Sequence, residues 1–364
     1  MSPINSRALI RDIIALRPVP RLGFWLGNPH PDTWPIYHAY FGTRTEEELR
    51  LKLGDDFRWI TPQYMDTTYR HPAGTKLFDA RQYKVFHGQP GPLALAETGA
   101  DIAAFDWPDP TYLDFSECLA ALRAAGPFYR ASGFWAPFFH DVMDLFGMEE
   151  YFVKMHTNPA VVQAVTARVC GFYLEANRRF FDAIDAAAPV SAGASPAERG
   201  VMVPSGTCPL IDAYFFGNDF GTQRDLIVSP RHFEEFILPW FRRFTDQARA
   251  RGYQVILHSC GSIARVIPDL IASGVNCLHP LQARASGMEA ERLARDFQGK
   301  IAFLGGIDTQ QLLVYGSPAD VRAEVRRLKD IFGPWWIVSP SHEALLPNVP
   351  PANVAAMADA AHEA

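Results

Sequence analysis

The sequence has few cysteines, no long apolar run and no excess of basic residues. An odd and sparse set of cysteines is typical of thiols in a reducing compartment and argues against a disulfide framework. The five are Cys118, Cys170, Cys208, Cys260 and Cys277. The first residues lack the apolar core of a signal peptide, and no stretch approaches the roughly 18 apolar residues of a membrane span. These absences predict a cytoplasmic protein that does not enter the membrane.

The charges nearly balance. There are 34 Lys and Arg residues against 40 Asp and Glu, for a formal net charge of −6, and no basic block. Nucleic acid and anionic membranes bind clustered positive charge, so neither is the expected main partner. The absence of a fixed-period repeat argues against a solenoid. A small molecule is the expected partner.

Apolar residues are plentiful: 48% of the 364 residues are hydrophobic and 20% are charged, which suits a large buried core and excludes disorder. Short apolar runs alternate with longer amphipathic stretches, a pattern typical of βα units. The expected strands are 21–27, 57–61, 127–134, 212–217, 254–259, 275–280, 301–306 and 335–339. Eight parallel strands with intervening helices predict an α/β fold, a single (β/α)8 barrel domain over residues 1–364.

Prolines mark the starts of three expected helices. In Asn158-Pro159, Ser229-Pro230 and Ser317-Pro318 a side-chain acceptor precedes a proline, the arrangement favoured at a helix start. The stripe of aromatic residues within 230–250 is expected to be core. Further helices are expected at 262–273, 288–297 and 318–330.

Two stretches do not follow the βα pattern. Residues 62–100 are expected to form a hairpin excursion that includes 82–88, and residues 187–206 an inserted loop of small residues. Neither is long enough to be a domain.

The active site of such a barrel lies at the carboxyl ends of its strands, so the residues that close each apolar run are the candidates. They include Asn28, Trp135, His140, Asp219, His258, Cys260, Gln282, Asp308, His342 and Glu343. His258 and Cys260 stand at i and i+2, project to the same side and can chelate one ion, for which zinc is the expected metal. The alternative is that Cys260 is only a small buried thiol.

A zinc site needs a third protein ligand. His342, in the loop that leaves the last strand, is the best placed. Cys277, His279 and Glu343 are alternatives, and Cys277 and His279 share one face of a strand. Three protein ligands would leave the fourth position to substrate, water or Gln282, as in catalytic zinc sites.

Asp219 and Asp308 each follow a strand beside glycines, which allow close approach to a ligand. Asp219 is expected to act with His258 in catalysis and to contact the substrate. Asn28, Trp135, Gln282 and Asp308 are the other expected substrate contacts, although Asp308 is as well suited to cap the helix that follows it. Six aromatics suggest an aromatic pocket, although such residues are more often core: Phe24, Trp25, Trp34, Trp135, Phe138 and Phe139.

Several motifs together resemble the uroporphyrinogen decarboxylase superfamily. They are GNDFGTQRDLIVSPRHFEEFILP, HSCGSIARVIPDLIASGVN, FLGGIDTQQLL and VSPSHEALLPNVPPANVAAM. The resemblance is close over about residues 200–360 and loose over the N-terminal third. It implies a single (β/α)8 barrel, in agreement with the strand pattern.

The resemblance implies one of two chemistries. True uroporphyrinogen decarboxylases carry an arginine-rich segment resembling MRQAGR near the first strand, where this chain reads FWLGNPHPD and so lacks the carboxylate clamp. The other branch comprises zinc methyltransferases that exchange methyl groups with corrinoid proteins. Their HisXCys motif corresponds to His258 and Cys260, and the position of their later cysteine is held here by His342. Gln282 stands where some relatives carry an acidic group.

The sequence therefore favours a zinc-dependent methyltransferase that moves a methyl group between a small thiol or methoxylated aromatic substrate and a corrinoid protein or tetrahydrofolate. One alternative is a metal-free decarboxylase of a small carboxylated substrate. Another is a barrel that binds a ligand without catalysis.

Overall fold

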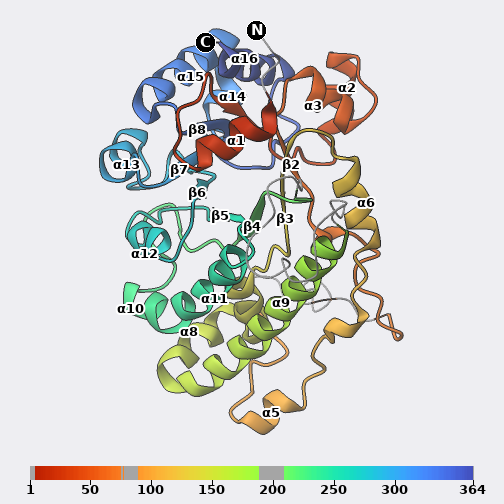
Figure 1. Ribbon diagram of the computed structural model, residues 1–364. Helices are drawn as coiled ribbons and strands as arrows, with labels where there is room; N and C mark the ends of the chain where they lie inside the picture. The colour runs from red at the N-terminus through yellow and green to blue at the C-terminus, as the bar shows by residue number, and fades with distance from the viewer. Residues whose placement is uncertain (1–4, 75–76, 78–88, 188–208, 364) are drawn as a thin grey trace.

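A computed structural model of the chain describes residues 5–74, 77, 89–187 and 209–363. Within them, eight parallel strands form a nearly closed barrel surrounded by helices (Figure 1). The strands are β1 (Gly23–Phe24), β2 (Phe57–Trp59), β3 (Tyr129–Ser132), β4 (Ala213–Gly217), β5 (Gln254–His258), β6 (Cys277–His279), β7 (Ala302–Ile307) and β8 (Trp336–Pro340). Each falls inside or within one residue of an expected strand, and the predicted (β/α)8 barrel is confirmed.

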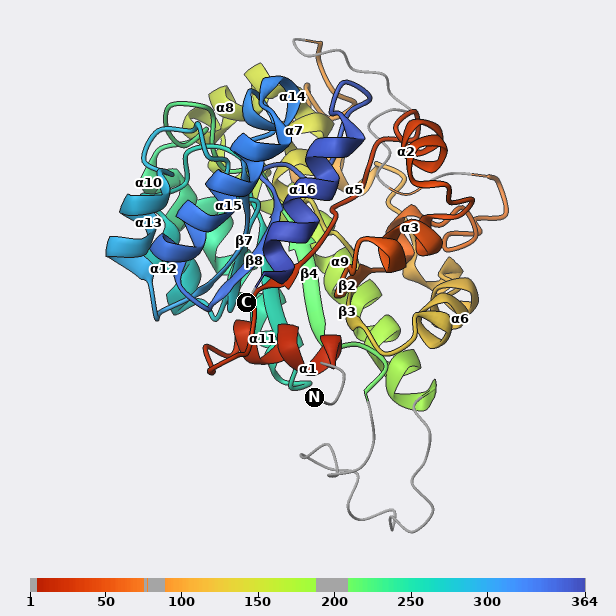
Figure 2. The ribbon, with the colours of Figure 1, turned by 90° about the horizontal axis from the view of Figure 1, so that it is seen from above.

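Helices follow most of the strands, and α15 and α16 run next to each other beside β8 (Figure 2). The described α-helices are α1 (Ser6–Ile14), α2 (Trp34–Phe41), α3 (Glu46–Lys52), α5 (Gly99–Ala103), α6 (Ser116–Ala124), α7 (Phe138–Phe146), α8 (Met148–Thr157), α9 (Pro159–Ala187), α10 (Pro230–His232), α11 (Leu238–Arg249), α12 (Ile267–Ala272), α13 (Ala290–Phe297), α14 (Leu312–Tyr315), α15 (Pro318–Phe332) and α16 (Pro351–His362). Two short 3-10 helices are η1 (Pro62–Tyr64) and η2 (Pro110–Tyr112). Of the described helices, none combines the length and the apolar character needed to cross a membrane.

The expected helix starts are confirmed. The Ser229 hydroxyl accepts a hydrogen bond from the His232 N–H at 3.2 Å, and Ser317 forms a reciprocal capping box with Asp320 at the start of α15. The helix expected at 230–250 is interrupted by a π-turn, η4 (Phe233–Ile237). Pro239, which has no N–H to donate, stands just after this turn, and its missing donor accounts for the change of hydrogen-bond pattern.

The inside of the barrel is a core of its own. It contains inward side chains such as Phe57, Phe215 and Leu304, and it includes residues of α1, which covers the amino ends of the strands. Gly23 at the start of β1 leaves room for α1, because a Cβ there would lie 2.4 Å from Cδ1 of Ile10. With one end closed by α1, only the carboxyl ends of the strands are left for a site.

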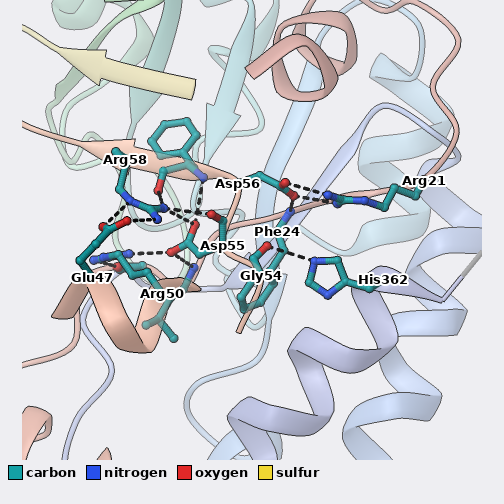
Figure 3. A network of polar contacts seen from close by, with 12 residues as sticks. Arg21, Phe24, Glu47, Arg50, Gly54, Asp55, Asp56, Arg58 and His362 are labelled. Atoms are coloured by element: carbon teal, nitrogen blue, oxygen red, sulfur yellow. Dashed lines mark hydrogen bonds and ion pairs between the residues drawn. The ribbon is translucent and has the colours of Figure 1, made fainter. Parts of the chain in front are cut away.

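One main-chain hydrogen bond and several side-chain contacts hold β1 and β2 together where the sheet lacks a ladder (Figure 3). The Asp56 N–H donates to the Phe24 carbonyl at 3.0 Å, and the Asp56 carboxylate accepts from the Phe24 N–H at 3.1 Å. Arg21 donates to both carboxylate oxygens of Asp56 at 2.7 Å. Asp55 accepts from Arg50 at 2.7 Å and from the Leu26 N–H at 3.3 Å. This buried polar network closes the barrel.

Two expectations differ from the structure or fall outside it. The helix expected at 262–273 is reduced to α12. The residues before it form a loop and a turn, in which the Ser262 N–H donates to the Thr222 carbonyl at 2.7 Å and the Val266 N–H to the Ile263 carbonyl at 3.0 Å. Residues 82–88 of the expected hairpin and the expected loop at 187–206, apart from Ala187 at the end of α9, lie outside the described residues. The described flanks of the hairpin, 62–74 and 89–98, contain η1 and turns.

Candidate functional site

Two loops at the carboxyl end of the barrel are locked to each other. The Cys260 N–H donates to Asp219 at 2.7 Å, and the Phe220 N–H donates to the Ser259 hydroxyl at 3.1 Å. Between them the backbones meet at Gly221 and Gly261, where a Cβ on Gly261 would lie 2.2 Å from the Gly221 carbonyl oxygen. Only glycine fits this approach, and Gly261 also has φ +85°. The loops after β4 and β5 therefore hold Asp219 and Cys260 side by side.

Asp219, His258 and Cys260 form one group of possible metal ligands. His258 Nε2 lies 3.4 Å from the Cys260 Sγ and 3.2 Å from an Asp219 carboxylate oxygen. One donor atom from each residue lies within 4.8 Å of the others. His258 is buried, whereas the Asp219 side chain is 39% exposed, so the group is reached from solvent on the Asp219 side.

The other ring nitrogen of His258 faces a second group. His258 Nδ1 lies 3.0 Å from His279 Nδ1 and 3.4 Å from a Glu343 carboxylate oxygen. The register of β5 and β6 pairs His258 with His279, which places the two rings next to each other. His258 is thus shared by two sets of polar groups, one on each ring nitrogen.

His342 lies at the edge of the site. Its ring centroid is 6.5 Å from that of His258, it contacts the Cys260 thiol, and its side chain is 46% exposed. Its Nδ1 accepts the Ala344 N–H at 3.1 Å, so Nε2 is the nitrogen that could bind a metal, but His342 belongs to neither described group of possible metal ligands. The loop that carries it rests on Gly27, where a Cβ would lie 2.6 Å from the Glu343 carbonyl oxygen.

The titratable groups of the site shift the pKa values of one another. Burial by itself would raise the pKa of Asp219, but the hydrogen bond and charge of His258, the Cys260 N–H and the charge of His140 together outweigh it and hold that pKa well below its usual range. Burial opposes protonation of His258 too, yet Glu343, Cys260 and Asp219 together raise its pKa well above the ordinary value. Burial depresses the pKa of His279 and of His140. The hydrogen bond to Cys260 raises the pKa of His342.

Trp135 covers the inner side of the site. Its ring centroid is 5.0 Å from that of His258 and 4.9 Å from that of Trp59. It fits because β4 ends in Gly217, where a Cβ would lie 2.0 Å from Cζ2 of Trp135. The aromatic surface expected at the site is thus present at Trp135. Phe24, Phe138 and Phe139 instead pack in the core outside the barrel, which corrects the expectation for them.

The other three residues expected to contact the substrate make different hydrogen bonds. The Gln282 side chain accepts the Gly261 N–H at 2.7 Å and so supports the loop that bears Cys260. The Asn28 N–H donates to the Glu343 carbonyl at 2.8 Å. Asp308 accepts the backbone N–H groups of Gln310 at 2.9 Å and Leu312 at 3.4 Å, which is the capping geometry.

Sequence reasoning did not foresee two contacts of the site. Asp219 binds the backbone of Cys260, and His279 meets His258 through the strand register; neither follows from spacing along the chain. The fully buried Cys277 lies in the barrel interior and belongs to neither described ligand group. Together with Cys118, Cys170 and Cys260 it is a free thiol.

Comparison with known proteins finds a family match over part of the chain and a shared fold. Residues 221–364 match the family described as Uroporphyrinogen decarboxylase (URO-D). No curated protein matches the chain. Among solved structures, a methyltransferase from Methanosarcina mazei aligns with a TM-score of 0.62 at 14% identity, over 99% of this chain and 98% of that one. At this identity the alignment shows a common fold. The family match covers residues 221–364, which include His258, Cys260 and His342, so this part of the chain is similar to the URO-D family.

Proposed function

We propose that the protein is a zinc-dependent methyltransferase that moves a methyl group between a small substrate and a corrinoid protein or tetrahydrofolate. The observation that carries the proposal is the Cys260 thiol 3.4 Å from His258 Nε2 at the carboxyl ends of the strands, with a carboxylate beside them. The fold shared with the methyltransferase from Methanosarcina mazei supports the choice of reaction class.

The donor set fits zinc. Thiolate, imidazole and carboxylate are the protein ligands that zinc uses, and a partly exposed group leaves room for a substrate ligand. His258 and Cys260 would supply two ligands. His342, which hydrogen-bonds to the thiol, would supply the third, and Asp219, which belongs to the same described ligand group as His258 and Cys260, is the alternative. Zinc bound there would act as a Lewis acid that activates a substrate thiol or polarises an ether oxygen.

The residues around the donors have separate tasks in this proposal. Asp219 is ionised, because its pKa is held low, so it accepts hydrogen bonds and orients a donor group of the substrate. Trp135 offers a partly exposed aromatic face beside His258, suited to a flat apolar substrate. Gln282, the Asp219 carboxylate and the backbone of Gly221 keep the loop bearing Cys260 in place.

A metal-free decarboxylase of a small carboxylated substrate is the second candidate, favoured by the description of the matching family. Asp219, paired with His258, would then stabilise a protonated intermediate. A polycarboxylate substrate is disfavoured, because the arginines nearest β1 and β2 are committed elsewhere. Arg21 pairs with Asp56, Arg50 with Asp55, and Arg58 with Glu47.

Elemental analysis of protein purified without a metal-binding tag tests the proposal. We expect about one zinc per chain in the wild type and its loss in Cys260→Ala. Cys118→Ala is the matched control, because this thiol is equally free but buried on α6 in the core outside the barrel. A wild-type protein that takes up no zinc even after incubation with the metal would eliminate the methyltransferase and leave the decarboxylase.

A further inference from the structure

The two ring nitrogens of His258 have opposite surroundings, and this decides which of them can bind a metal. Nε2 faces the Cys260 thiol and Asp219, whereas Nδ1 faces His279 at 3.0 Å and Glu343 at 3.4 Å. A ring nitrogen that binds a metal carries no hydrogen, so a neutral His258 bound through Nε2 must carry its hydrogen on Nδ1. That hydrogen needs an acceptor, since His258 is buried.

The nearer acceptor is His279. A contact of 3.0 Å between two imidazole nitrogens requires one donor and one acceptor. If His258 Nδ1 donates, His279 Nδ1 accepts, and the hydrogen of His279 is then on its Nε2. That Nε2 is buried and has no hydrogen-bond partner among the described residues. An unmet buried donor of this kind is destabilising, so this tautomer of His279 has a free-energy cost that the hydrogen bond from His258 must offset.

His279 is held firmly enough to impose this arrangement. Its carbonyl accepts the Ser259 N–H at 2.9 Å, in the continuation of the β5–β6 ladder. Its ring packs against Trp25 at 5.2 Å and against Phe215 at 5.4 Å between centroids, inside the barrel. The side chain is fully buried, so it lies too deep to be the part of the site that meets a substrate.

We propose that His279 is a positioning residue that fixes the tautomer and the ring plane of His258, so that the Nε2 lone pair points to Cys260 and Asp219. The metal part of this inference rests on the proposed function. The tautomer itself is a property of the protein without metal. A doubly protonated His258 has no tautomer, but its Nδ1 still donates to His279, whose own hydrogen stays on Nε2.

The first test is the nitrogen NMR spectrum of the histidine rings in metal-free protein, assigned with His279→Asn. We expect His279 to carry its hydrogen on Nε2. A hydrogen on Nδ1 of His279 would make it the donor to His258 and would overturn the proposal. This readout does not depend on zinc.

The second test is zinc affinity, measured by competition with a chelator, in substitutions of His279. His279→Leu removes the acceptor, and we expect zinc to bind about 10- to 100-fold more weakly, as for other groups that orient metal ligands. His279→Asn places an amide oxygen near the position of Nδ1, and we expect affinity within about 3-fold of wild type. His279→Gln reaches toward the position of Nε2 instead and should not restore affinity. The comparison of His279→Asn with His279→Gln tests the positioning role even if His279→Leu does not fold.

Ile256→Val is the matched control, because Ile256 is an equally buried inward residue of β5 that provides no polar atom. It should bind zinc as the wild type does. Zinc binding by His279→Leu equal to that of wild type would overturn the positioning role. If the wild type binds no zinc at all, the proposed function fails, while the NMR result still decides the tautomer.

Discussion

Asp56→Ala tests how the barrel is closed between β1 and β2. The Asp56 side chain is 1% exposed and accepts three hydrogen bonds, two from Arg21 and one from the Phe24 N–H. Its removal leaves the Arg21 guanidinium, whose side chain is 14% exposed, without its counter-charge, and leaves the Phe24 N–H without this acceptor. Breaking a buried ion pair from one side costs about 3–5 kcal/mol, and the N–H accounts for roughly 1 kcal/mol within it.

Urea unfolding, followed by both fluorescence and circular dichroism, measures this loss. We expect the free energy of unfolding to fall by about 3–5 kcal/mol in Asp56→Ala, and by less in Asp56→Asn, whose amide oxygen still accepts the Phe24 N–H. Asp359→Ala is the control, because Asp359 pairs with Arg322 on the surface and is 62% exposed; its loss should cost less than about 1 kcal/mol. If Asp56→Ala unfolds within 1 kcal/mol of wild type, the side-chain closure of the barrel is refuted.

Three further outcomes are expected at the other end of the barrel. Gly217→Ala should lower the free energy of unfolding in urea by about 1–3 kcal/mol and change the tryptophan fluorescence, because its Cβ would lie 2.0 Å from Trp135. An unchanged spectrum and stability would show that the indole lies elsewhere. Trp135→Ala should weaken substrate binding in calorimetry while zinc content stays constant, and unaltered affinity would remove the aromatic wall from the site. Zinc affinity should rise with pH by up to about tenfold per pH unit for each proton released. The reason is that the raised pKa of His258 keeps the ring protonated until zinc displaces the proton. Equal affinities in calorimetry at pH 6 and pH 8, values spanning the ordinary histidine pKa, would contradict this.

Local pattern was enough to predict the strands and several of the helices of this barrel. Each strand is a short apolar run, and the helices α9, α10 and α15 begin at a proline preceded by a polar cap. The π-turn before Pro239 and the shortening of α12 were not predicted. Ser262, in the loop that precedes α12, contacts Thr222 on a different loop, a contact that spacing along the chain does not reveal.

In the site, too, some contacts are determined by the sequence alone and others by the tertiary structure. His258 and Cys260 are two residues apart at a strand end, so their approach is a local property that the sequence determines by itself. The partners of His258 come from elsewhere: Asp219 from the loop after β4, His279 across the β5–β6 register, and Glu343 from the loop after β8. Only the closed barrel brings them together, because parallel strands place residues far apart in the chain at one edge and the register selects which of them touch.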